Sequence, residues 1–96
     1  MSKIVAVFNV PDMTATSYRQ VMRDLNASGA EHPPGRLSHL ASNTEKGMIV
    51  VDTYDGVESL QRFGETLMPI LVKNGVTPPK PDVAFIENEV VPPGKR

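Results

Sequence analysis

The spacing of apolar side chains changes along the first third of the chain. Residues 3–10 are mostly apolar and rich in β-branched side chains, and Pro11 interrupts them, so we predict a strand. After Thr14, a predicted N-cap, apolar side chains recur at every third or fourth position: Tyr18, Val21, Met22 and Leu25. This spacing predicts an amphipathic helix that ends at Gly29.

The middle of the chain predicts a β-hairpin. Residues 31–35 include two prolines, which lack an amide donor and exclude a helix there. Residues 36–42 alternate in polarity, residues 48–54 form a β-branched run, and residues 43–47 between them favour a turn. We therefore predict two antiparallel strands joined by a short connection.

A second helix is predicted after the hairpin. Asp55 and Glu58 fit a capping box at its start. Its apolar stripe follows helical spacing: Val57, Leu60, Phe63, Leu67 and Leu71. Pro69 should kink the helix or end its regular part, and residues 74–75, Asn-Gly, supply a stop signal.

The last strand is predicted at residues 83–91, after a proline-rich connector. The elements then follow the order β-α-β-β-α-β, and right-handed crossovers place both helices on one face of a four-stranded antiparallel sheet. This is a ferredoxin-like α+β fold. Residues 1–91 form one domain, and we predict a frayed C-terminal tail at residues 92–96.

Apolar side chains on both faces of the predicted sheet point to a homodimer. In the first strand Ile4, Ala6 and Phe8 alternate with Val5 and Val7, although a sheet with one wet face should carry polar residues there. The helices cover only one face. A second copy of the chain is the simplest cover for the other face, which predicts a homodimer through the sheet face.

Composition excludes several classes of partner. The chain has 96 residues, a formal net charge of -1 and no cysteine. The balanced charge would attract neither nucleic acid nor an anionic membrane. The first apolar run is too short for a signal peptide, and no run approaches the roughly 20 residues that cross a bilayer. We expect a cytoplasmic protein without nucleic-acid or membrane partners.

Residues 50–63, VVDTYDGVESLQRF, resemble the third-strand-to-second-helix stretch of the dimeric α/β-barrel superfamily, in particular its antibiotic-biosynthesis-monooxygenase-like branch. The order of elements extends the resemblance over nearly the whole chain. It implies a dimer whose barrel interior binds a small organic molecule. The superfamily includes cofactor-independent monooxygenases, haem-degrading enzymes, isomerases and non-catalytic ligand sensors. Several relatives, the haem-degrading ones among them, carry a histidine where this chain has Phe63, so we expect no haem and no other cofactor.

Candidate catalytic residues follow from the pairing of the two hairpin strands. A two-residue or four-residue connection would align three pairs: Ala41 with Val50, His39 with Asp52, and Leu37 with Tyr54. The alternate residues of the second strand are more uniformly apolar, so we assign them to the helices: Ile49, Val51 and Thr53. His39, Asp52 and Tyr54 then face the interior of the barrel. A three-residue connection would separate His39 and Asp52 onto opposite faces.

His39, Asp52 and Tyr54 have the chemistry of a catalytic site. A histidine oriented by a carboxylate beside a phenol can act as a general base toward an acidic C–H or O–H. The alternative is a partly hydrated cross-strand pair that contributes about 0.2 to 1 kcal/mol to stability and has no catalytic role.

Three further residues are candidates for ligand binding. His32 and Arg36 bracket a Pro-Pro-Gly turn that can present a cation and an imidazole to a carboxylate, although such a turn is also typical of a solvated loop. Asn9 interrupts a buried strand and either lines the cavity or pairs at a strand edge. The two histidines lack metal-binding spacing, so no metal site is expected.

Two functions remain open from the sequence. In the first, a small aromatic or polyketide-like molecule binds in the barrel and is oxygenated or isomerised without metal or flavin. In the second, the chain is a non-catalytic ligand-binding or protein-interaction module, which the absence of a clear nucleophile or acid–base array favours. The sequence does not identify the ligand.

Overall fold

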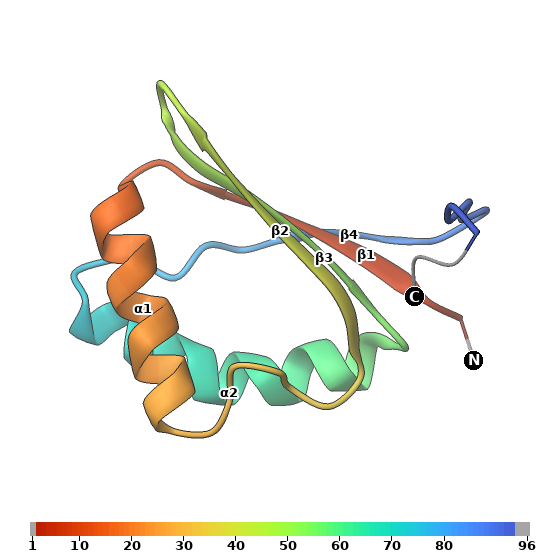
Figure 1. Ribbon diagram of the computed structural model, residues 1–96, viewed down its shortest axis with the longest axis horizontal. Coiled ribbons are helices and arrows are strands. Elements are labelled where there is room, and N and C mark those ends of the chain that lie inside the picture. The colour runs from red at the N-terminus through yellow and green to blue at the C-terminus, as the bar shows by residue number, and fades with distance from the viewer. Residues whose placement is uncertain (1, 94–96) are drawn as a thin grey trace.

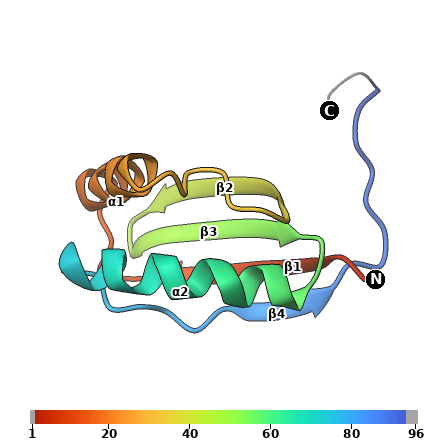
Figure 2. The ribbon, with the colours of Figure 1, turned by 90° about the horizontal axis from the view of Figure 1, so that it is seen from below.

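Six elements are present in the computed structural model, which describes residues 2–93 (Figure 1). They are β1 (Ile4–Val10), α1 (Ala15–Ala27), β2 (Arg36–Thr44), β3 (Gly47–Tyr54), α2 (Val57–Lys73) and β4 (Asp82–Phe85). The strands form one antiparallel sheet in the order β2-β3-β1-β4. Both helices lie on the same side of the sheet (Figure 2). The predicted ferredoxin-like fold is confirmed.

Helix α1 begins at the predicted residue. The Thr14 hydroxyl accepts from the Ser17 amide at 3.0 Å, and the Ser17 hydroxyl accepts from the Thr14 amide at 2.8 Å, a complete capping box. Gly29 follows the helix with φ of 78°, a left-handed conformation that glycine adopts without strain. Val21 and Leu25 of the apolar stripe are buried in the hydrophobic core.

Helix α2 lacks the predicted cap at its start. Gly56 is its N-cap and no side chain caps the helix, so the capping box predicted at Asp55 and Glu58 is wrong. The Asp55 carboxylate instead accepts from the Ser59 hydroxyl, one turn into the helix. Pro69 lies inside the helix, which continues to Lys73, so the predicted helix end at this proline is wrong, whereas the predicted kink stays a prediction.

The hairpin has the predicted two-residue connection, Glu45–Lys46, and pairs His39 with Asp52. A bulge between Arg36 and Ser38 changes the register at the far end, so Arg36 rather than Leu37 lies opposite Tyr54. The predicted pairing of Leu37 with Tyr54 is therefore wrong. An inserted residue of this kind leaves no clear signal in a strand that alternates regularly on both sides of it.

The face assignment of the hairpin strands is also wrong. In β3 the buried residues beneath the helices are Met48, Val50, Asp52 and Tyr54, whereas the alternate residues face the open side of the sheet. The more uniformly apolar set of β3 residues is not the set beneath the helices. The buried Asp52 carboxylate is satisfied by hydrogen bonds, which offset the cost of its burial. The core beneath the helices includes Ile4, Ala6, Val10, Met13, Val21, Leu25, Phe63, Leu71 and Val76.

Strand β4 is shorter than predicted. It spans four residues, Asp82–Phe85, rather than residues 83–91. It pairs only with β1, and the ladder ends where β1 begins, at the pair Ile4 and Phe85. The Ile86 amide donates to the Lys3 carbonyl at 3.0 Å, and residues 87–93 belong to no strand. Of the predicted tail 92–96, residues 94–96 lie outside the described residues.

The open face of the sheet carries apolar side chains, as the sequence predicts. Val7 of β1 pairs with Val51 of β3, which also pairs with Leu40 of β2, and Val5 of β1 pairs with Thr53. Leu40 is 63% exposed and Ile49 is 36% exposed. Across residues 2–93 no helix has the length and apolar character required to span a bilayer.

Candidate functional site

A cavity of about 370 Å³ lies between the sheet and the two helices. The sheet contributes Phe8 and Val50 to its wall, the helices contribute Val21 and Leu67, and the connector after α2 contributes prolines. A volume of this size and an apolar lining are typical of sites for small organic molecules. The cavity thus lies within a single chain, on the helix side of the sheet.

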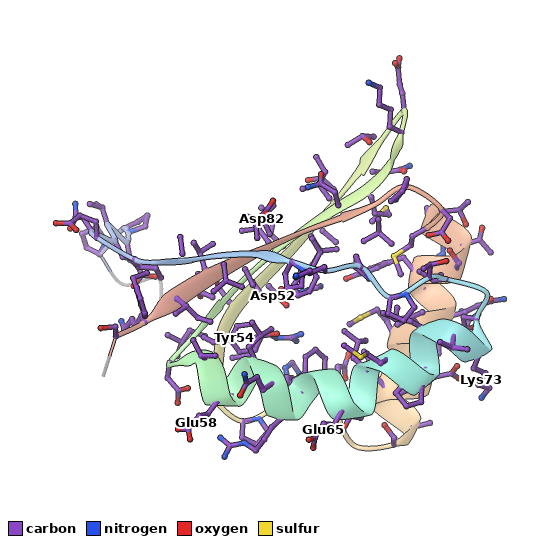
Figure 3. The ribbon with its side chains drawn as sticks, turned by 180° about the vertical axis from the view of Figure 1, so that it is seen from behind. Asp52, Tyr54, Glu58, Glu65, Lys73 and Asp82 are labelled. Carbon is purple, nitrogen blue, oxygen red and sulfur yellow. The ribbon has the colours of Figure 1, made fainter. Side chains whose placement is uncertain are left out.

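One part of the cavity wall is polar and consists of a chain of hydrogen bonds. The Tyr18 hydroxyl lies 2.7 Å from His39 Nε2, and His39 Nδ1 lies 2.6 Å from Asp52 Oδ1. The Tyr54 hydroxyl donates to the other carboxylate oxygen, Asp52 Oδ2, at 2.9 Å. Asp52 and Tyr54 point from the sheet toward α2, whereas Asp82 points away from the helices (Figure 3). Helix α1 and strands β2 and β3 together build this chain.

The chemistry of Asp52 fixes the direction of these hydrogen bonds. An ionised carboxylate only accepts, so His39 Nδ1 carries the hydrogen that lies between them. In a neutral imidazole the other nitrogen, Nε2, then has a lone pair and accepts from the Tyr18 hydroxyl. The lone pair of His39 is thereby directed at Tyr18.

Burial differs along the chain of hydrogen bonds. Tyr54 is 0% exposed and Asp52 is 3% exposed, whereas the His39 side chain is 21% exposed. Every buried side-chain nitrogen or oxygen among the described residues has a hydrogen-bond partner. Tyr54 is therefore the end of the network fixed in the core, whereas Asp52, His39 and Tyr18 line the cavity.

Both tyrosines are held in the neutral form. Burial raises the pKa of Tyr54 well above its usual value, and the charge of Asp52 and the hydrogen bond to it add to this shift. Burial also raises the pKa of Tyr18, where the positive charge of Arg36 opposes the shift and the negative charge of Asp52 supports it. Each phenol is accordingly a hydrogen-bond donor at neutral pH.

Arg36 places a positive charge beside this network. Its guanidinium lies 5.4 Å from the centre of the Phe63 ring and donates to the Glu31 carbonyl at 2.8 Å. The side chain also lines the cavity. A guanidinium held by a ring and a carbonyl retains donors that can bind an oxygen anion.

The three predicted catalytic residues come together in the structure, but not where the sequence placed them. His39, Asp52 and Tyr54 are joined by hydrogen bonds on the helix side of the sheet. His39 and Asp52 line the cavity, whereas Tyr54 lies behind Asp52 in the core. Their roles in catalysis remain a prediction.

The three predicted ligand-binding residues are separated. Arg36 lines the cavity, and His32 is exposed in the loop before β2, outside the cavity wall. Asn9 is exposed and pairs with Ile49, on the open face of the sheet. Within residues 2–93 no three side chains of the types His, Asp or Glu are close enough together to hold a metal ion.

Tyr18 is the site residue that the sequence did not indicate. Its position in the apolar stripe of the first helix was explained by packing alone. The available signal was its hydroxyl group, because a tyrosine on a buried helix face normally requires a hydrogen-bond partner. The identity of that partner, His39, depends on how α1 crosses the sheet.

No protein-family model matches the chain, and no curated protein matches it in sequence. Among solved structures, a monooxygenase of Streptomyces coelicolor in complex with nanaomycin D aligns with a TM-score of 0.62 and 16% identity, over 95% of this chain and 92% of that one. SnoaB, a cofactor-independent oxygenase of Streptomyces nogalater, aligns with a TM-score of 0.58 and 13% identity, over 97% and 99%.

A third solved structure has the same fold. It is an antibiotic biosynthesis monooxygenase that aligns with a TM-score of 0.52 and 15% identity, over 96% of this chain and 100% of that one. The chain has the antibiotic-biosynthesis-monooxygenase fold. This confirms, for the fold, the resemblance that residues 50–63 indicated. Identities this low leave the reaction to be argued from the site.

Proposed function

We propose that the chain binds a small, mostly apolar organic molecule between its sheet and helices and removes a proton from it. The observation that supports this proposal most strongly is the hydrogen-bonded chain of Tyr18, His39 and Asp52 at the wall of an otherwise apolar cavity. An apolar site strengthens the electrostatic effect of each group within it. The proposed reaction type is therefore general-base catalysis.

In this proposal His39 is the base and Asp52 orients it. Asp52 holds the imidazole through Nδ1 and stabilises the imidazolium that forms when Nε2 takes a proton. The Tyr18 hydroxyl is hydrogen-bonded to Nε2, so the proton reaches His39 through Tyr18. The Tyr18 oxygen accepts the proton of the ligand while the hydroxyl proton of Tyr18 moves to His39 Nε2. Arg36 stabilises the resulting anion of the ligand.

The ligand anion has two ways to continue. If the proton returns to a different atom of the ligand, the outcome is isomerisation. If molecular oxygen adds to a carbanion derived from a CH₂ group, the peroxide anion takes the proton back from His39, and the hydroperoxide loses water to leave a carbonyl. The second route is cofactor-independent oxygenation. It is favoured by the similarity in fold to SnoaB, the cofactor-independent oxygenase of Streptomyces nogalater.

A ligand-binding module without catalysis is the second candidate. The observation that favours it is the hydrogen bond from Tyr18, which already occupies the lone pair that a base requires. Binding without proton transfer would then be the function of the cavity.

We also propose that two copies associate through the open face of the sheet. This face carries an apolar surface that no element among residues 2–93 covers. It consists of Val5, Val7, Val51 and Leu40. An isologous contact buries this surface on both copies at once. Such a dimer would leave the cavity of each subunit on the outer, helix side.

Hydrogen–deuterium exchange of a carbon acid tests the base directly. 2-Tetralone, a two-ring ketone with acidic CH₂ groups, is incubated anaerobically in D₂O with the protein, and loss of its C1 proton signal is followed by NMR. We expect exchange above the buffer rate, reduced about 100-fold or more in His39→Gln. His32→Gln is the matched control, because His32 is exposed and outside the cavity wall.

The two candidate functions give different results. Exchange that depends on His39 supports the base. Binding of 2-tetralone without exchange favours the module, and equal exchange by wild type and His39→Gln contradicts the role of His39.

A further inference from the structure

The inward face of α2 has one position without a side chain. Its apolar residues follow helical spacing and all line the cavity: Leu60, Phe63, Leu67, Met68 and Leu71. Gly64 lies on the same face, four residues after Leu60 and three before Leu67, and it also lines the cavity. A large side chain is therefore missing at the centre of the stripe.

Nothing in the packing of the protein requires glycine at this position. Gly64 is an interior residue of the 17-residue helix, and its φ is not among the positive values. A Cβ atom built on Gly64 would meet only the end of the Met68 side chain, Cε, at 4.0 Å. Gly35 and Gly47 differ from it, because a Cβ there would overlap neighbouring atoms.

Glycine in a helix interior also lowers stability relative to alanine, because it increases the conformational entropy of the unfolded chain. Gly64 is thus unfavourable for the helix and unnecessary for packing. The remaining effect of Gly64 is on the cavity, which extends to the helix backbone at this point. Another part of the boundary is stiff, since it consists of Pro78, Pro79 and Pro81.

We propose that Gly64 determines the size of ligand that the cavity accepts, by letting a flat, apolar ring system lie against the backbone of α2. This inference rests on the proposed ligand-binding function and adds a specificity-determining residue to it. Leucine at this position would project into the cavity and occupy the space of such a ring. Alanine would narrow the cavity only slightly.

Calorimetric titration with phenol and 2-naphthol, a one-ring and a two-ring probe, tests the proposal on the full chain. We expect wild type to bind 2-naphthol more tightly than phenol. Gly64→Leu should weaken 2-naphthol binding by about tenfold or more, a typical effect of altered volume in an apolar pocket. Gly64→Ala should weaken 2-naphthol more than phenol and raise Tm, because alanine favours the helix.

Thr66→Leu is the matched control, because Thr66 is an exposed residue of the same helix that does not line the cavity. It should bind both probes as wild type does. If wild type binds and Gly64→Leu binds 2-naphthol equally well, the role of Gly64 is wrong while the cavity remains a binding site. If wild type binds none of the three compounds, phenol, 2-naphthol and 2-tetralone, both this proposal and the proposed function are wrong.

Discussion

At the scale of single residues, the sequence predicted three of the four residues of the polar network, His39, Asp52 and Tyr54, but not Tyr18. His39 and Asp52 follow from pairing arithmetic, because the short connection and the strand period fix which side chains are opposite. The contact of Tyr18 with His39 does not follow, since it joins a helix to a strand 21 residues later. The face was mispredicted because Asp52 is satisfied within the core by His39 and Tyr54.

The tyrosine network makes a spectroscopic prediction. The chain has two tyrosines and no tryptophan, so tyrosinate absorbance near 295 nm reports Tyr18 and Tyr54 alone. In the folded protein neither should ionise near the usual pKa of 10.0, because burial raises both values. In urea both should titrate near that value.

The same shifts determine how stability depends on pH. A pKa raised in the folded state means that above pH 10.0 the unfolded chain releases protons that the folded chain retains. The free energy of unfolding should therefore be unaffected by these groups below that pH and fall above it. Native tyrosines that ionise near pH 10.0 without loss of far-UV circular dichroism would contradict the burial of the network.

At the scale of elements, local patterns predicted α1 and the hairpin, which depend on nearby residues. The length of β4 was not predictable from its own apolar run, because β4 ends where β1, the strand beside it in the described sheet, begins. The start of α2 was mispredicted because the Asp55 side chain binds the Ser59 hydroxyl. Competing partners of this kind appear only when the chain is folded.

The junction between the loop before β2 and the start of α2 provides a stability test. Gly35 has φ of 86°, and a Cβ there would overlap the Ser59 hydroxyl oxygen. Gly35→Ala should lower the free energy of unfolding by about 2 to 4 kcal/mol, through backbone strain and overpacking together. Urea denaturation measures the loss.

Gly29→Ala is the matched control for this change. Gly29 has a similar φ of 78°, but a Cβ there would meet no atom within 4 Å. It should lose only the cost of the left-handed conformation, about 1 kcal/mol. Equal losses in the two variants would show that Gly35 is not confined by Ser59.

At the scale of the whole molecule, the sheet has two unlike faces with different proposed roles. The helix side encloses the cavity, and the open side is the proposed dimer contact. Leu40→Asp places a charge at a residue of the open face that is 63% exposed, and we expect it to convert a dimer to a monomer. Light scattering after size-exclusion chromatography gives the mass.

Val72→Asp is the control for the dimer, because Val72 is 64% exposed on α2, on the helix side of the sheet. It should leave the mass unchanged. A wild-type protein that is monomeric at all concentrations would contradict the proposed association.

The most direct measurement for the central claim is methyl NMR during titration with 2-tetralone. The methyl group of a strand residue lies on one face of the sheet, so its chemical shift reports ligand binding on that face. A backbone amide lies in the plane of the sheet and would respond to binding on either face. The cavity set is Val21, Met22, Leu25 and Leu67, and the open-face set is Val5, Val7, Leu40 and Val51. A ligand site between sheet and helices predicts shifts in the cavity set alone. Shifts confined to the open-face set, or none in either, would contradict it.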